Sequence, residues 1–471
     1  MNFKFGKFNL STSNLNSIAF FNILAPIILN GIHFLTLPIF TRILSQEDFG
    51  IVSIYTTWVG ILSIFIALQT HGSIGTAFIH FPKEEHKPYM ASILGISSSS
   101  FIAVALLVLI FLYPISSFLE LEPTLILIML LHSLGSFGVN FALFKFLFYK
   151  EAHKNFILSV IVSVSSTALA LVLVFAAKEK LYFSRIIGMA IPNVLVGLFF
   201  IVRFITSGRG SPWKKYWHFC LPITIPLVFH NLSHLLLSQG ARISIQKIYG
   251  FSQVGIYNLV FTFVQILSIL YSALNNTWVP FYYDDLKARD RKTIIDKTKN
   301  YTVLFTVVTA AFIFASPEVF RIFANEPYWE AIPLIPVMAC SVYFTFLYSF
   351  PVNFQFYHRK TLGISIGTTL AAFVNLGLVY LFVPLWGLQG AALAMLISYI
   401  LLFFLHIFIA IRVIKSEYYY KLSYIVAGVL SVFVASMLFF ILYDLWYIRW
   451  FFAVILGVGL LLFIIRNKRL F

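Results

Sequence analysis

The chain is dominated by apolar stretches of about 20 residues, and this pattern limits its possible folds more than any other feature. Stretches of that length match the roughly 30 Å hydrocarbon thickness of a bilayer, so each predicts a transmembrane α-helix. Only 11% of the 471 residues are charged, whereas about a quarter are charged in soluble domains. A transmembrane barrel would instead show segments of about ten alternating residues. We therefore predict an all-α integral membrane protein.

Division of the apolar stretches predicts fourteen transmembrane helices joined by short connections. The predicted spans are 17–41, 49–70, 89–113, 124–148, 156–176, 183–206, 218–240, 252–280, 300–324, 331–356, 361–383, 389–411, 421–443 and 447–466. The first stretch is too long for a cleaved signal peptide, and we expect it to remain as a span. No connection is long enough to fold as a separate catalytic domain. Whatever the protein does is therefore expected to happen among its helices.

The positive charges predict how the spans are oriented. The formal net charge is +16. When the N-terminus is placed in the cytoplasm, all but eight of the 33 Lys and Arg residues fall on the cytoplasmic side, while the acidic residues divide about evenly. The eight are Arg42, Lys178, Lys180, Arg185, Arg242, Lys247, Arg321 and Arg449. This is the positive-inside bias, so the basic composition indicates topology and attraction to anionic lipid rather than nucleic-acid binding. Both termini are predicted to be cytoplasmic.

An internal repeat divides the predicted spans into two sets. The segment APIILNGIHFLTLPIFTRI resembles IPLVFHNLSHLLLSQGARI, so that Pro26 aligns with Pro226 and Arg42 aligns with Arg242. Span 1 then resembles span 7 and span 2 resembles span 8, which is a parallel repeat about an axis along the membrane normal.

The repeat predicts two six-helix lobes related by a pseudo-two-fold axis, followed by two extra helices. The expected divisions are residues 1–206, 207–416 and 417–471. Two such lobes with a site at their interface are typical of transporters. Pro26 and Pro226 would each remove one helical hydrogen bond, and we interpret them as hinges. Prolines tolerated within spans without a hinge role are the alternative.

Polar side chains within the spans are the candidate substrate-binding residues. The segment HNLSHLLLSQGAR begins at His230 inside an apolar run, where polar groups facing lipid would be costly. Such groups are expected to face the bundle interior or a water-filled cavity. The candidate cavity residues are Arg42, Arg242, His33, His230, His234, Asn30, Asn231, Gln265 and Asn276. Simple interhelical hydrogen bonding and, for the arginines, extension to the membrane interface are the alternatives.

Acidic residues are missing from the interiors of the predicted spans. Every Asp and Glu falls in a connection or at the end of a span. Transporters of cations usually need a buried carboxylate, whereas Arg, His, Asn and Gln suit phosphates, sugar acids and sugars. The pattern therefore favours a large anionic or sugar-bearing substrate. The two cysteines, Cys220 and Cys340, lie in or beside spans and indicate no disulfide framework or metal site. We expect no cofactor.

Three segments carry a resemblance to a known family. They are TRILSQEDFGIVSIY from Thr41, YGFSQVGIYNLVFTFVQILSILYSALNNTWVPFYYDD from Tyr249 and PLWGLQGAALAMLISYILLF from Pro384. In order and spacing they resemble the polysaccharide-biosynthesis flippases. These are the O-antigen and capsule repeat-unit translocases of the multidrug/oligosaccharidyl-lipid/polysaccharide exporter (MOP) superfamily, and the likeness covers nearly the whole chain.

This resemblance implies a transporter, not an enzyme, in the bacterial inner membrane. It implies movement of an undecaprenyl-pyrophosphate-linked oligosaccharide to the outer leaflet by alternating access, with proton or sodium coupling. Polymerase and chain-length proteins are the implied partners, beside membrane lipid. Two alternatives remain, namely a drug/cation antiporter of the same superfamily and a membrane-embedded polysaccharide polymerase or ligase. The absence of buried carboxylates argues against the first, and the short outer connections argue against the second.

Overall fold

A computed structural model describes residues 4–5, 8–9, 31–32, 34–208, 213–358, 360–413 and 420–466. The strands are β1 (Lys4–Phe5) and β2 (Phe8–Asn9), which form a short antiparallel pair. The α-helices are α2 (Gln46–Ala67), α3 (Ile74–His80), α4 (His86–Ile110), α5 (Leu112–Leu119), α6 (Pro123–Phe148), α7 (Ala152–Ala176), α8 (Leu181–Ser207), α9 (Trp213–Ala288), α10 (Arg291–Phe323), α11 (Leu334–Tyr357), α12 (Thr361–Phe408), α13 (Leu422–Ile441) and α14 (Trp446–Arg466). Short 3-10 helices are η1 (Thr70–Ser73), η2 (Lys83–Glu85) and η3 (Glu326–Ala331), and η4 (Ile409–Val413) is a π-helix.

Eleven helices within these ranges are long and apolar enough to cross a membrane. Two of them turn sharply at a glycine, α9 at Gly250 (φ 80°, ψ 179°) and α12 at Gly387 (φ 56°, ψ −134°). Residues that have a Cβ atom rarely adopt these backbone dihedral angles, whereas glycine adopts them at little cost. Each of these helices thus covers two predicted spans, so the eleven helices correspond to predicted spans 2 to 14. The all-α membrane fold is confirmed.

The connection between the first two spans is fixed by a helix cap. A helical segment, Phe34–Ile43, overlaps the last part of predicted span 1 and ends two residues beyond it. Ser45 then begins α2 with a reciprocal capping box, in which Ser45 Oγ accepts from the Asp48 amide at 3.0 Å and the Ser45 amide donates to Asp48 Oδ2 at 3.1 Å. Such caps satisfy backbone N–H groups that have no helical partner.

The chain divides into two compact units, Met1–Leu235 (unit 1) and Leu236–Phe471 (unit 2). The boundary falls inside α9, because that helix runs from Trp213 to Ala288. The predicted three-part division at residues 206 and 416, with its pseudo-two-fold relation, stays a prediction.

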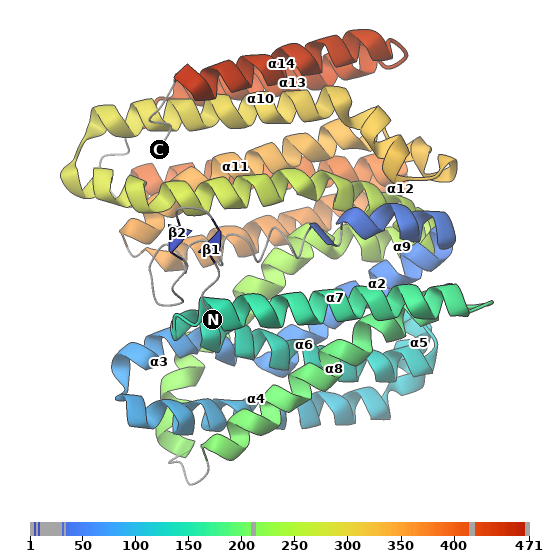
Figure 1. Ribbon diagram of the computed structural model, residues 1–471, viewed down its shortest axis with the longest axis vertical. Helices are drawn as coiled ribbons and strands as arrows, with labels where there is room; N and C mark the ends of the chain where they lie inside the picture. Colours follow the sequence, from blue (N-terminus) through green and yellow to red (C-terminus); the bar gives the residue numbers. More distant parts are fainter. Residues whose placement is uncertain are drawn as a thin grey trace. The chain divides into compact units, whose positions relative to one another are not determined.

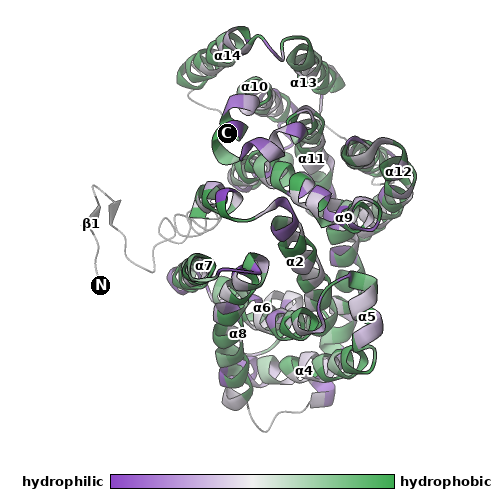
Figure 2. Cartoon of the chain, turned by 90° about the vertical axis from the view of Figure 1, so that its right-hand side faces the viewer, coloured by the Kyte–Doolittle hydropathy of each residue, from purple (hydrophilic) through white to green (hydrophobic). Residues whose placement is uncertain are grey.

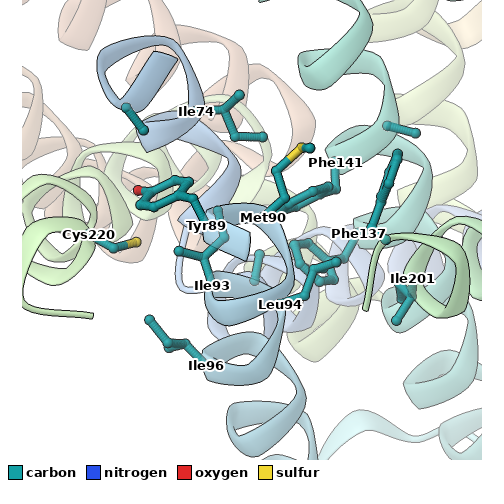
Figure 3. Packing of buried hydrophobic residues seen from close by; sticks show 14 of the residues in the cluster. Ile74, Tyr89, Met90, Ile93, Leu94, Ile96, Phe137, Phe141, Ile201 and Cys220 are labelled. Carbon is teal, nitrogen blue, oxygen red and sulfur yellow. The ribbon is translucent and has the colours of Figure 1, made fainter. Parts of the chain in front are cut away.

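Unit 1 has an aromatic and aliphatic core built from α4, α6, α8 and the first part of α9. Figure 3 shows Met90 beside Phe141, and the Tyr89 ring directed toward Cys220 of α9. Tyr89 and Phe141 are completely buried. Outside this core, the exposed side chains of α8 are largely apolar, as expected for a surface in contact with lipid (Figure 2). The core therefore holds together helices whose other faces meet hydrocarbon.

Glycines allow α6 and α8 to approach closely (Figure 1). A Cβ atom on Gly135 would lie 2.6 Å from Val194 Cα, and one on Gly197 would meet the carbonyl oxygen of Gly135. Small residues at such a contact increase van der Waals packing, which drives helix association where the hydrophobic effect is absent. This contact fixes the spacing of α6 and α8 around the cavity described below.

Unit 2 includes the two C-terminal helices, which pack on α10. Arg449 of α14 is 1% exposed and binds Glu318 of α10, with Nη2 to Oε1 at 2.6 Å and Nη1 to Oε2 at 3.1 Å. A bidentate pair of this kind is directional as well as attractive, so it fixes α14 against α10.

We expect Gly197→Ala to lower the midpoint of thermal unfolding by about 5 °C, because the added methyl group cannot be accommodated without separating α6 from α8. Gly457→Ala is the matched control, since nothing lies within 4 Å of a Cβ there. The control should leave the midpoint unchanged or slightly higher, because alanine favours helix. Thermal unfolding of the purified proteins followed by intrinsic fluorescence measures both. Equal midpoints for wild type and Gly197→Ala would contradict the close-packing argument.

Candidate functional site

A cavity of about 290 Å³ with both polar and apolar lining residues lies in unit 1, between the segment Phe34–Ile43 and helices α6, α7 and α8. Its polar lining residues are Thr36, His132, Ser159, Ser163, Ser166, Thr167, Arg185 and Asn193. No Asp or Glu occurs among the described residues that line it. The cavity thus combines one guanidinium with hydroxyl, amide and imidazole groups in the part of the protein that crosses the membrane.

Arg185 provides the positive charge of this cavity. The residue is 4% exposed, and its guanidinium carbon lies 4.2 Å from the ring centre of Phe40 and 4.8 Å from that of Phe49. Guanidinium groups are attracted to aromatic faces, more strongly when water is excluded. The two rings therefore help to hold the planar cation in place.

Contacts at the start of α8 position Arg185 one turn inside the helix. Lys180 caps α8 and donates to Glu122 Oε1, at the start of α6, at 2.6 Å. Tyr182 donates to the same carboxylate oxygen at 3.0 Å, and its amide donates to Asp48 at 3.3 Å. The hydrogen bonds from Lys180 and Tyr182 lower the pKa of Glu122. Any stability from this carboxylate is therefore present above the usual Glu pKa and is lost as the pH falls through the lowered value.

His132 joins α6 to α2 at the edge of the cavity. Its Nδ1 lies 3.1 Å from the Tyr55 hydroxyl, and the two rings are 5.8 Å apart. His132 is 6% exposed and Tyr55 is fully buried. The imidazole thus has a structural partner on one side while it lines the cavity on the other.

Helices α7 and α8 contribute the neutral polar groups. Ser159, Ser163 and Ser166 recur at spacings of four and three along α7, which places them on one face. Asn193 Nδ2 donates to the Met189 carbonyl at 2.9 Å and lies 3.4 Å from Ser166 Oγ. A cavity whose lining includes a cation, hydroxyl groups and an amide suits an anionic or polyhydroxylated ligand.

Sequence reasoning did not select Arg185 or the serines of α7. Arg185 stands near the start of predicted span 183–206 and was assigned to the outer connection with the other cations there. The α7 serines show a helical spacing that could have identified a polar face. The stacking partners Phe40 and Phe49 are more than 130 residues before Arg185 in the chain, so no local pattern indicated them.

Four of the predicted cavity residues lie in unit 1. Arg42 is exposed, and its neighbour Thr41 is buried with its hydroxyl bonded to the Pro38 carbonyl at 3.2 Å. His230, Asn231 and His234 follow one another on the first part of α9. His230 and Asn231 are half-buried and His234 is exposed. None of these four residues lines the cavity that contains Arg185.

Three others lie in unit 2. Arg242 is 6% exposed, donates from Nη1 to Gln239 Oε1 at 3.0 Å, and lies over the ring of Phe261 at 4.9 Å. Gln265 is half-buried and Asn276 is exposed, both on the second part of α9. The roles of these residues as a cavity lining stay predictions.

Pro26, Asn30 and His33 lie outside the described residues. Pro226 is exposed within α9, and the backbone there stays helical, since the helix departs from helical dihedral angles at Gly250. The hinge roles of Pro26 and Pro226 stay predictions.

Comparison with known proteins places the chain in a family. Residues 18–283 match the model of the polysaccharide biosynthesis protein family. The match covers more than half of the sequence and includes the whole cavity of unit 1, and the chain belongs to this family. A relative described as an uncharacterized membrane protein of Haemophilus influenzae is 24% identical over 355 residues, covering 73% of this chain and 84% of the relative.

Solved structures show the same fold at low sequence identity. The lipid II flippase MurJ in an inward closed conformation is similar with a TM-score of 0.67 at 15% identity, over 96% of this chain and 99% of MurJ. An inward-facing multidrug resistance MATE family transporter of the MOP superfamily is similar with a TM-score of 0.63 at 13% identity. This match covers 85% of this chain and 99% of the transporter. The chain is thus a multi-pass membrane protein with the all-α fold of these MOP transporters.

A double-mutant cycle tests whether His132 has the structural role seen here. Tyr55→Phe and His132→Phe are each expected to destabilise the protein by about 1–2 kcal/mol, because each leaves a buried polar group without its partner. The double variant should lose less unfolding free energy than the sum of the two single losses, and the difference, the coupling energy, should be about 1 kcal/mol. Unfolding of the four proteins under one condition measures the coupling, and additive losses would show that the pair is not bonded.

Proposed function

We propose that the protein translocates an undecaprenyl-pyrophosphate-linked oligosaccharide repeat unit across the bacterial inner membrane. The observation that carries this proposal is a buried guanidinium in a cavity of hydroxyl and amide groups whose lining contains no described carboxylate, in a member of the polysaccharide biosynthesis protein family. Arginine pairs well with phosphate and sugar carboxylates. Hydroxyl and amide side chains can replace the water around sugar hydroxyls.

The proposed mechanism is alternating access, in which two lobes expose the sugar head first to the cytoplasm and then to the outside. The isoprenoid tail remains in lipid while the head occupies a polar cleft. Arg42, Arg242, His33, His230, His234, Asn30, Asn231, Gln265 and Asn276 are proposed to line this cleft. Arg185 is proposed to bind an anionic group of the head. Pro26 and Pro226 are proposed as hinges.

Two features of the described residues favour this proposal over the two alternatives, the drug/cation antiporter and the polymerase or ligase. A drug/cation antiporter needs a negative group to hold its cargo, and the cavity lining has none. A polymerase or ligase needs a positioned acid or base and an extended outer segment. The outer connection between α5 and α6 is three residues long, and that between α7 and α8 is four. The likeness to a lipid II flippase in fold agrees with a lipid-linked substrate.

A complementation experiment tests the proposal and the role of Arg185. A deletion strain should accumulate untranslocated lipid-linked units and lose its surface polysaccharide, and the wild-type gene should restore it. We expect Arg185→Gln to restore less than about a tenth of the wild-type level, since it removes a charge that the phosphate would need. Arg185→Lys should restore an intermediate level, because an ammonium lacks the planar, bidentate geometry.

Lys178→Gln is the matched control, because it removes an exposed cation from the same end of the helices without touching the cavity. This variant should restore surface polysaccharide fully. Full restoration by Arg185→Gln at equal protein level would remove Arg185 from the site. Normal translocation with unpolymerised units in the deletion strain would favour the enzyme, and drug sensitivity without a polysaccharide defect would favour the antiporter.

Coupling to a proton gradient is proposed through the histidines, whose unperturbed pKa lies near 6.5. Dissipating the proton gradient in right-side-out vesicles with an uncoupler should stop transfer of the lipid-linked unit, while dissipating a sodium gradient should not. Transfer that continues after loss of the proton gradient but ceases without sodium would assign the coupling to sodium instead. Residues 230–234 would then have no role in coupling.

A further inference from the structure

A second hollow in unit 1 combines apolar walls with four cations. This groove, of about 770 Å³, is lined by residues of α4, α6, α7 and α8. Its walls include Met90, Ile161, Leu195, Phe199 and Phe200. Its lining also contains Lys87, Lys145, Lys154 and Arg203. The residues of this groove are distinct from those of the Arg185 cavity.

The four cations stand at one end of the groove. Lys87 and Lys154 are near the starts of α4 and α7, whereas Lys145 and Arg203 are near the ends of α6 and α8. Consecutive antiparallel helices bring these termini to the same membrane surface. By the distribution of Lys and Arg this is the cytoplasmic surface. The groove therefore opens with positive charge at the interface and continues with hydrocarbon side chains toward the bilayer centre.

Only part of this charge is compensated within the described residues. Lys145 and Lys154 both bind Glu151, at 2.6 and 2.8 Å. Burial by itself raises the pKa of Glu151, but the hydrogen bonds from these two lysines lower it overall, so the carboxylate remains ionised. Lys87 and Arg203 are exposed, and no ion pair to a described carboxylate involves either of them. The rim thus keeps a net positive charge.

The depth of the groove matches one leaflet. Arg203 and Leu195 are eight residues apart on α8, which is about 12 Å along a helix axis. One leaflet of hydrocarbon is about 15 Å deep. An acyl chain lying along the aromatic and aliphatic walls would therefore place its headgroup phosphate at the level of the cations.

We propose that this groove is a binding site for an anionic glycerophospholipid of the cytoplasmic leaflet, with its phosphate on Lys87 and Arg203 and an acyl chain along α7 and α8. Basic pockets between transmembrane helices on the cytoplasmic side are suited to anionic headgroups. The site does not depend on the proposed transport function. A lipid bound there would contact α4, α6, α7 and α8 through residues that do not line the Arg185 cavity.

Lipid titration of the full-length protein followed by native mass spectrometry tests the site. The probes are dioleoyl phosphatidylglycerol and, as a zwitterionic comparison, dioleoyl phosphatidylcholine. We expect one phosphatidylglycerol to be retained at least about tenfold more tightly than phosphatidylcholine. The double variant Lys87→Gln/Arg203→Gln should weaken this binding by about tenfold or more, because each basic residue near the headgroup contributes favourably.

Two further variants separate the groove from general charge effects. Lys287→Gln/Lys292→Gln removes two exposed cations elsewhere and should leave phosphatidylglycerol binding unchanged. Ile161→Trp keeps every cation but fills the apolar wall, and it should weaken binding as the charge variant does. Equal weakening by the control pair, or undiminished binding in both groove variants, would overturn the proposal. Preferential retention of undecaprenyl phosphate over phosphatidylglycerol would overturn the assignment to a glycerophospholipid.

Discussion

Hydrocarbon offers no hydrogen-bond partner to the backbone, and the rest of this structure follows from that constraint. Every segment that crosses the membrane must satisfy its own N–H and C=O groups, which a helix does. Inside α9 and α12 the chain leaves helical geometry at glycines, Gly250 and Gly387, which tolerate the change. At the start of α2, the side chains of Ser45 and Asp48 replace the missing hydrogen-bond partners.

The same constraint separates polar from apolar surfaces in unit 1. Lipid-facing positions of α8 are apolar, while Arg185 and Asn193 of the same helix face the cavity. The close contact of Gly135 with Gly197 brings α6 and α8 together. A buried guanidinium is tolerated because Phe40 and Phe49 stack on it. Packing therefore places a buried cation and several hydroxyl groups beside one cavity within an apolar bundle.

The fold could be predicted to a large extent from the sequence, and the site only in part. The length of each apolar stretch and the positions of Gly and Pro locate helices well, because both signals are contained in a window of about 25 residues. No described Asp or Glu lines the unit 1 cavity, but the cleft that the sequence predicted has other lining residues and stays a prediction. The prediction did not select Arg185, because a cation near a span end has the same local sequence whether it extends to the interface or turns inward. Arg242 contacts Gln239 and Phe261. The contact with Phe261 depends on tertiary structure, because the turn at Gly250 separates the two residues along α9.

The sequence by itself determined that this chain is a bundle of membrane helices, because hydrophobic length acts locally. The placement of most cations on one side of the membrane stays a prediction from loop charge. Tertiary structure alone decided which helices touch and which polar groups share a cavity. Tyr55 meets His132, and Phe40 meets Arg185, across separations of 77 and more residues. The periodicity of polar and apolar residues shows which face of a helix is polar. It does not show which helix packs against that face, because helix pairing depends on the fit of whole surfaces.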